Sequence, residues 1–465
     1  MMSSPSNLLT KKLDEVVEFE REAVPEGKLK NSSSFWGMYA GEHTAGTEFV
    51  IGPLFVAHGA SAGDMVLGLL IGNLFAVLSW AFITAPIATK ARLTLYFQLE
   101  KITGKRLALI YNLVNALMFC FLAGSMIAVS ATAVGIPFSL AMPSLTDLYP
   151  NSFGWIIAVM IVGSVTTLVA MFGYSQVARM AKYTAPWMIL VFIAAAVSVL
   201  PDLGITKLSD FWPVANEKIW TGVPLQGQTK FSFFHVMFFA WFCNLAMHIG
   251  MSDLSILRYA KKWHYGFASS AGMFVGHYIA WIASGILYSL FLLESNNSME
   301  FAPGPIAYRA AGLAGAICVI IAGWTTANPT IYRAGLALQA IMPSSKTWKV
   351  TMIIGLITTG AACFPALVMK LLDFVALYGL ILMPMGAIIF ADFWFLPKMQ
   401  LKQNYAGFKK LTFSWPAAGS WIITLIISTF LPLDIFFKAL PGWFLAVIIY
   451  TGMSFIQQKM MAKEI

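Results

Sequence analysis

Twelve apolar runs of membrane-spanning length, separated by short polar gaps, are the feature that most limits what this chain can fold into. Only 11% of its 465 residues are charged and 58% are hydrophobic, whereas a soluble domain carries roughly 25% charged residues. So few charges cannot cover the surface of a soluble globule of this size. The pattern excludes a soluble enzyme, a disordered chain, a fibrous protein and a small disulfide-stapled module, and it predicts a protein solvated mainly by lipid.

The runs predict an all-α polytopic membrane fold with twelve transmembrane helices. They lie near residues 35–57, 64–88, 106–135, 153–173, 183–200, 231–252, 266–293, 308–341, 350–369, 371–396, 416–433 and 439–458. The polar residues 1–31 contain no apolar core segment, so we interpret them as a cytosolic N-terminal tail and not as a signal peptide. The four cysteines each lie inside an apolar run and outside any CxxC or Cys/His cluster, so we expect no disulfide and no metal site on them.

Basic residues alternate between the gaps in a way that indicates orientation. If the N-terminus is cytosolic, 23 of the 30 Lys and Arg residues fall in cytosolic segments, as the positive-inside rule requires. One missed helix would destroy this asymmetry. Both termini are therefore predicted to be cytosolic.

Two of the runs contain segments that are unsuited to an unbroken membrane helix. Gly41–Glu48 places two glycines, two threonines, a histidine and two carboxylates near the middle of the first run, and Asn244–Asp253 mixes glycine with polar residues in the sixth. Irregular backbone at membrane depth is tolerated where it lines a cavity. Paired interrupted helices in two halves of a chain are typical of inverted-repeat secondary transporters. The other interpretation is that both segments are helix ends and loops.

The spacing of the two segments also predicts a division of the chain. After the tail, residues 32–200 would form a first five-helix repeat and residues 201–230 an extracellular connection. Residues 231–397 would form the second five-helix repeat, and residues 398–465 would hold helices 11 and 12 and the C-terminal tail.

The eighth run carries adjacent hydroxyl groups, Thr325 and Thr326, one turn after the carbonyl of Ala322. Hydroxyl and carbonyl oxygens are the ligands that a hard cation prefers, and they carry no fixed charge. The other interpretation is that both hydroxyls only bond back to carbonyls of their own helix.

Several segments resemble the nucleobase–cation symporter-1 family, in the same order along the chain. Leu70–Leu74, Trp324–Gly335 and Met383–Trp394 resemble helices 2, 8 and 10 of cytosine permeases, and Arg258–Tyr259 resembles the arginine–aromatic pair that follows helix 6. Ala45–Gly52 is similar to the first helix of the hydroxymethylpyrimidine-permease branch. The resemblance implies a LeuT-like fold of five plus five inverted helices with broken helices 1 and 6. It also implies uptake coupled to Na⁺ or H⁺ and a bacterial inner membrane.

The resemblance implies a sodium site whose ligands can be carried over residue by residue. The Ala-x-x-Ser/Thr-Thr pattern of helix 8 is matched by Ala322, Thr325 and Thr326, where the Na⁺ would lie. Two carbonyls three residues apart in the break of helix 1 map to Glu42 and Ala45.

The resemblance also implies where a heterocycle would bind. A polar residue beyond the threonine pair corresponds to Asn328, and the helix 6 break lies around Asn244 to His248. The third run lacks the Gln-x-x-Trp of cytosine permeases, so the hydrogen-bond pattern must differ, although a flat ring can stack on Phe119 or Trp241. The predicted substrate-binding residues are Glu48, Phe119, Trp241, Asn244, His248 and Asn328.

Ionisable residues inside the apolar runs keep both Na⁺ and H⁺ as candidates for the coupling ion, since an ionisable group within the membrane is expected by default to have a function. Glu42 or Glu48 could change protonation state and give proton coupling, or accept a hydrogen bond from the substrate. Simpler readings are that Asp253 pairs with Arg258, and that Arg333 extends its long side chain toward the cytosolic end of helix 8.

We therefore predict a secondary active transporter that imports a small planar nitrogen heterocycle, a nucleobase or pyrimidine-like compound, with Na⁺ or H⁺ by alternating access. The alternative is a cation-coupled importer of another small solute such as an amino acid or a quaternary amine, because fold does not fix substrate. No HExxH or P-loop pattern occurs, so we predict no enzyme and no cofactor beyond the coupling ion. The expected partners are a small-molecule substrate and the lipid bilayer, with no nucleic acid. A monomer is one compatible assembly, and the oligomeric state stays open.

Overall fold

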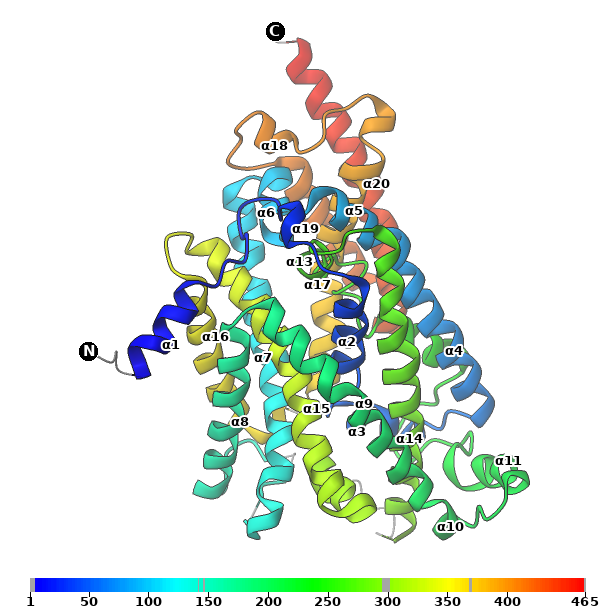
Figure 1. Cartoon of the computed structure of the whole chain (residues 1–465). Helices are drawn as coiled ribbons and strands as arrows, with labels where there is room; N and C mark the ends of the chain where they lie inside the picture. Colours follow the sequence, from blue (N-terminus) through cyan, green and yellow to red (C-terminus); the bar gives the residue numbers. More distant parts are fainter. Residues whose placement is uncertain (1–4, 141, 145–146, 295–301, 368–369, 464–465) are drawn as a thin grey trace.

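The computed structural model describes residues 5–140, 142–144, 147–294, 302–367 and 370–463. Within these ranges every regular element is a helix, apart from two isolated β-bridges. The helices stand side by side in one bundle, and the short helices α6 and α18 lie at the same end of it as the C-terminus (Figure 1).

The first five predicted spans are α2 (Ser32–Glu42) with α3 (Glu48–Ala57), α4 (Ala62–Ser79) continued by η2 (Trp80–Thr84) and α5 (Ala85–Ala91), α7 (Lys105–Val134), α8 (Phe153–Met171) and α9 (Tyr174–Ser198). The next five are α12 (Phe233–Phe242) with α13 (Leu254–Leu257), η7 (Ala271–Tyr278) with α14 (Ile279–Glu294), α15 (Pro303–Ile341), α16 (Thr347–Ala362) and α17 (Leu371–Trp394). The last two are α19 (Trp415–Phe430) and α20 (Ile435–Lys463).

Shorter helices cap the two ends of the bundle. α6 (Leu95–Thr103) and α18 (Tyr405–Phe408) lie at one end, whereas α10 (Leu200–Leu203) and α11 (Phe211–Val214) lie at the opposite end (Figure 1). α1 (Pro5–Asp14) precedes the first span. Because the spans alternate in direction, the Lys- and Arg-rich segments between them lie at the end of the bundle that carries α6 and α18.

In the described part of the chain, 8 helices are long and apolar enough to cross a membrane. The four remaining predicted spans are the two broken pairs, α2/α3 and α12/α13, and the 16-residue helices α16 and α19. The prediction of an all-α polytopic membrane fold is confirmed. Residues 368 and 369, at the end of the ninth predicted run, lie outside the described residues.

Helices α7 and α15 pack against each other along the centre of the bundle. Ser130 Oγ of α7 donates a hydrogen bond to the carbonyl of Ile320 on α15 at 3.1 Å, and Gly323 leaves the space that Ser130 occupies. Small residues allow such close backbone approach in membrane helices, where apolar burial alone gives no preference for protein over lipid. α15 is thereby held closely against α7, beside the broken first helix.

The break in the first helix follows from its sequence. α2 ends at Glu42, after which the N–H and Oγ1 of Thr44 both donate to the carbonyl of Ala40, and the Glu48 N–H bonds the carbonyl of Ala45 at 3.1 Å, where α3 begins. Between them, Gly46 packs so closely on α7 and α15 that a Cβ there would lie 2.9 Å from Val129 Cγ1 and 3.3 Å from Gly323 N. A larger residue would push the break away from α15.

The sixth helix is broken over a longer stretch. α12 ends at Phe242, and the chain resumes helical structure only at Leu254. Met251 has φ 69° in this stretch, a left-handed conformation that costs energy for a residue with a side chain. Both sequence segments that were singled out as irregular are therefore breaks and not helix ends.

Residues 13–31, here called the N-terminal strap, run across the end of the bundle that carries α6. Arg21 binds both carboxylate oxygens of Glu100 on α6 at 2.7 and 2.8 Å, and the Lys30 N–H bonds the carbonyl of Tyr259 at 2.8 Å. Asp14 lies 2.5 Å from Lys346. Hydrogen bonds from Lys346 and Trp348 lower the pKa of Asp14.

Glu18 is the buried centre of the strap. Its carboxylate accepts hydrogen bonds from the Tyr174 N–H at 3.0 Å, from Tyr259 at 2.7 Å and from Tyr332 at 2.6 Å, and it lies 3.5 Å from Arg258. These partners belong to α9, to the turn after α13 and to α15. One side chain of the tail thus ties three separate spans together.

A buried cavity between the two broken helices

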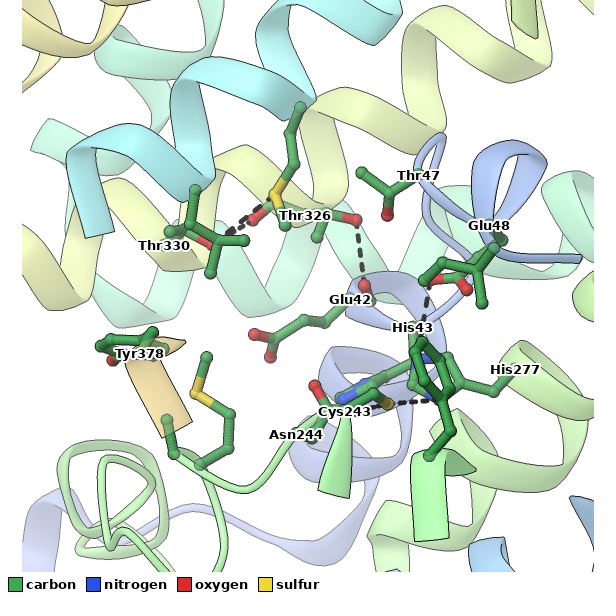
Figure 2. A pocket seen from close by; sticks show the side chains of 16 residues that line it. Glu42, His43, Thr47, Glu48, Cys243, Asn244, His277, Thr326, Thr330 and Tyr378 are labelled. Carbon is green, nitrogen blue, oxygen red and sulfur yellow. Dashed lines mark hydrogen bonds and ion pairs between the residues drawn. The ribbon is translucent and has the colours of Figure 1, made fainter. Parts of the chain in front are cut away.

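A small cavity lies where both helix breaks face α15 (Figure 2). Its volume is about 60 Å³, far below the roughly 300 Å³ at which drug-sized ligand pockets begin. Glu42, His43, Thr47, Glu48, Cys243, Asn244, His277, Thr326, Thr330 and Tyr378 supply its polar groups. Its apolar walls are Ile51, Leu122, Met126, Phe239, Ala246 and Met247.

Oxygen atoms from the end of α2 and from α15 meet at one edge of the cavity. Thr326 Oγ1 donates to the carbonyl of Glu42 at 2.9 Å and to that of Ala322 at 3.0 Å, and the first of these bonds is visible in Figure 2. Thr325 Oγ1 lies 3.0 Å from the same Ala322 carbonyl. We call these four groups the oxygen cluster. Four oxygens from two segments that face each other suit a hard monovalent cation.

The fifth predicted cation ligand, Ala45, lies in the same break. Its carbonyl accepts the Glu48 N–H at 3.1 Å, which leaves its second lone pair free. The hydroxyls also bond to carbonyls of their own helix, as the other interpretation expected. Only Thr326 bridges to α2 as well.

Glu48 opens α3 and is fully enclosed. Its carboxylate accepts a hydrogen bond from Trp281 Nε1, and its Oε1 lies 3.6 Å from His277 Nε2. Ser284 Oγ donates to its backbone carbonyl at 2.8 Å. Among the described residues no Lys or Arg pairs with it, so this carboxylate can receive N–H groups from a ligand.

Histidines follow Glu48 around the cavity. The rings of His43 and His277 lie 4.9 Å apart, and His43 Nδ1 lies 3.0 Å from the carbonyl of Tyr39. Gly272 and Gly276 let η7 approach this closely, because a Cβ on either would lie within 3 Å of His43. The imidazoles are thus held by packing next to the carboxylate.

Next to the cavity, Arg333 joins two carboxylates in a fully buried triad. Its guanidinium contacts Glu42 at 2.5 and 3.1 Å and Asp253 at 2.6 Å. Tyr39 and Trp80 donate to the second oxygen of Asp253 at 2.8 and 2.7 Å. The triad joins the end of α2, the start of α13 and α15.

The triad corrects two simple readings of the sequence. Arg333 is 0% exposed and does not extend toward the end of its helix, since two carboxylates hold it within the bundle. Asp253 pairs with Arg333 and not with Arg258, whose partner is Glu18 of the strap. Sequence proximity misled here because the partners of both residues, Arg333 and Glu18, come from distant parts of the chain.

Four of the predicted substrate-binding residues lie outside the cavity lining in this conformation. Phe119 packs edge-on against Tyr378, and Trp241 points to α4, where it donates to Ser79 Oγ at 3.0 Å. His248 Nε2 lies 2.9 Å from the carbonyl of Trp241, and Asn328 Nδ2 lies 3.1 Å from Met180 Sδ. Glu48 and Asn244 do line the cavity.

Several lining residues were not singled out from the sequence. His277 and Tyr378 carry the most chemistry, and Thr47, Cys243 and Thr330 add smaller polar groups. The signal for His277 was present, because Gly272-x-x-x-Gly276 directly precedes it and such spacing marks close helix contacts. Nothing local to Tyr378 marks it, since its position depends on how α17 packs.

A larger cavity of about 810 Å³ lies on the other side of α3. Val50 and Leu54 line this outer cavity, whereas Ile51 lines the central one. Its other walls come from the loop before α12, α12 itself, α14, α17 and the start of α20, with His58, Phe231, His235 and Asp434 among the lining residues. The N-terminal strap lies across the end of the bundle that carries α6.

The sequence matches no protein-family model and no curated protein sequence. Solved structures, in contrast, match over almost the whole chain. A closed conformation of Mhp1, a nucleobase-cation-symport-1 family transporter with bromovinylhydantoin bound, has a TM-score of 0.71 at 14% identity, covering 94% of this chain and 95% of that one.

Two further solved structures are similar to this chain over almost its whole length. An inward-facing conformation of Mhp1 has a TM-score of 0.69 at 13% identity and covers 95% of both chains. A substrate-bound, outward-open Na⁺-coupled sialic acid symporter has a TM-score of 0.67 at 11% identity, covering 97% of this chain and 96% of that one. The chain therefore has the LeuT-like fold that these membrane transporters share, as the resemblance in the sequence implied.

Proposed function

We propose that the protein is a secondary active transporter that imports a small planar nitrogen heterocycle together with Na⁺. The observation that carries the proposal is the oxygen cluster, in which α2 and α15 present carbonyl and hydroxyl oxygens beside a polar cavity. Residues Glu42, Ala45, Ala322, Thr325 and Thr326 would hold the ion. The motifs shared with the nucleobase–cation symporter-1 family support membership of that family.

The cavity walls support a flat ligand that carries N–H groups. Glu48 offers a carboxylate without a Lys or Arg partner, and Asn244 adds an amide. Phe239 and Met126 form apolar surfaces against which a ring can pack. The hydantoin bound by Mhp1 is a ring of this kind. The cavity would have to expand around such a ligand.

Transport would proceed by alternating access between the two ends of the bundle. The outer cavity would receive the substrate, and release of the N-terminal strap would open the other end. We propose residues 32–200 and 231–397 as the two inverted repeats, the connection 201–230 as extracellular, and both termini as cytosolic in a bacterial inner membrane. The basic residues at the strap end support this orientation.

A thermal-shift screen of the purified protein in detergent tests the proposal. Nucleobases, hydantoins, pyrimidine vitamin precursors and amino acids would each be added in Na⁺ and in choline buffer. A ligand that binds only the folded state raises the midpoint by mass action. We expect a heterocycle to stabilise more in Na⁺ than in choline. Stabilisation by an amino acid alone would overturn the substrate class and leave the fold unaffected.

Thr326→Ala is expected to weaken Na⁺ binding by roughly tenfold or more, since a contact to a charged group is worth about 1.5–3 kcal/mol. The measurement is the Na⁺ concentration that gives half-maximal thermal stabilisation. Thr166→Ala is the matched control, because Thr166 is buried in α8 and bonds only to carbonyls of its own helix. Equal effects of the two variants would contradict the assignment of Thr326.

The second candidate is proton coupling, which the contact between Glu48 and His277 favours. Heterocycle binding that depends on pH and is indifferent to Na⁺ would support it. Glu48→Gln should then abolish the pH dependence, whereas Thr326→Ala should leave binding unchanged.

A further inference from the structure

We propose that the triad of Glu42, Asp253 and Arg333 supplies the negative charge that draws the coupling cation to the oxygen cluster. The inference rests on the proposed cation coupling. It goes further because it gives a role to Asp253 and Arg333, which contribute no ligand to the ion. They act through Glu42 as positioning residues.

Glu42 belongs to both arrangements. Its backbone carbonyl accepts from Thr326 in the oxygen cluster, and its carboxylate is held by Arg333 in the triad. The carbonyl also lies at the C-terminal end of α2, where the helix dipole adds partial negative charge. A single residue therefore transmits a change in the triad to the cation site.

The triad holds two carboxylates against one guanidinium. In the part of the chain that the structure describes, Arg333 is the sole Lys or Arg that bonds to Glu42 or Asp253. The other donors to Asp253, Tyr39 and Trp80, are neutral. They stabilise the carboxylate and leave its charge uncompensated. Unbalanced charge away from water is costly, and a monovalent cation at the adjacent cluster would neutralise it.

Other titratable groups also surround this region. Glu48 begins α3, His43 follows α2, His277 lies on η7, and His248 lies in the break after α12. None of them forms a salt bridge with the triad. They are the same in every variant below, so measurements at one fixed pH isolate the triad charge.

A charge series on the full-length protein tests the inference. In Asp253→Asn the triad has no net charge, and in Arg333→Gln it has two negative charges. In the double variant it has one negative charge, as in the wild type. The readout is the Na⁺ concentration for half-maximal thermal stabilisation, with choline keeping the ionic strength constant. A unit charge acting across roughly 10 Å at an effective dielectric constant of about 20 changes an affinity by about tenfold.

We expect Asp253→Asn to need about tenfold more Na⁺, Arg333→Gln to need less than the wild type, and the double variant to return toward the wild-type value. Asp392→Asn is the control, since Asp392 is an equally buried carboxylate in the last turn of α17, where it accepts hydrogen bonds from the Asn404 N–H and from Tyr450. It should leave the Na⁺ requirement unchanged.

Opposite signs for the two single variants distinguish charge from mere structural damage, which would weaken Na⁺ binding in both. A shift of the same sign in both, or none in Asp253→Asn, overturns the inference. If Arg333→Gln does not fold, Glu42→Gln gives a second neutral triad and keeps the carbonyl, so it must match Asp253→Asn. A wild-type protein with no Na⁺ response would instead refute the proposed cation coupling itself.

Discussion

Arg333→Gln is expected to lose roughly 3–5 kcal/mol of stability in choline buffer, the usual cost of breaking a buried ion pair by removing one partner. The guanidinium is 0% exposed and bonds to two carboxylates. Its removal leaves both of them buried without a positive charge. Chemical unfolding in mixed micelles, followed by tryptophan fluorescence, measures the loss.

Arg309→Gln is the matched control. Arg309 also pairs with a carboxylate, Glu294, but both side chains are partly exposed, and an exposed ion pair contributes about 0–1 kcal/mol. Arg333→Lys should fall between the two, because an ammonium keeps the charge and cannot reproduce the fork of a guanidinium. Losses of equal size at positions 309 and 333 would contradict the triad as a stabilising centre.

The fold could be predicted from the sequence because each membrane helix is defined by residues that are contiguous in the sequence. Each apolar run has to satisfy its own backbone hydrogen bonds, so run length and charge placement determine where helices lie. The two breaks were visible for the same reason, since Gly46 and the polar residues beside it cannot be accommodated in an unbroken helix within lipid.

The candidate site could be predicted only where its residues lie close together in the sequence or where the family resemblance connects distant ones. Thr325 and Thr326 share one helix turn, and Glu42 is in the break that faces them, so the oxygen cluster was accessible from pattern and resemblance. The side of a helix that faces the cavity could not be predicted in this way. Trp241 and Asn328 lie on apolar runs whose rotation is set by tertiary packing, and both point away from the cavity lining.

The charge network was beyond sequence reasoning for a related reason. Arg333 and Glu42 are 291 residues apart, and Tyr332 and Glu18 are 314 apart. Predicting buried ion pairs and hydrogen bonds between such distant residues requires knowledge of which helices are neighbours. A single sequence offers only the nearest opposite charge, and for Asp253 that was Arg258, the wrong partner.

Glu18→Ala is expected to cost roughly 3–5 kcal/mol as well, because it leaves Arg258 buried without its carboxylate. It also removes the acceptor of hydrogen bonds from Tyr174, Tyr259 and Tyr332. These donors lie on α9, after α13 and on α15, which must separate for the strap end to open under the proposed alternating access. The variant should therefore populate the open state as well as unfold more easily.

Cys243 gives a direct readout of that opening, since it lines the central cavity. In a background where Cys120, Cys318 and Cys363 are replaced by alanine, a membrane-impermeant maleimide applied from the strap side should label Cys243 about tenfold faster in Glu18→Ala. A tenfold change in the open population corresponds to about 1.4 kcal/mol, a fraction of the interactions that are removed.

Glu26→Ala is the control within the same strap, because the Glu26 side chain is 86% exposed and makes one long contact, 3.4 Å, with Arg92. It should alter neither stability nor labelling. Faster labelling in Glu18→Ala alone would identify the Glu18 carboxylate as the group that holds this end closed. Lost stability with unchanged labelling would mean that Glu18 supports the folded bundle in every conformation, and that the strap stays in place while the end opens around it.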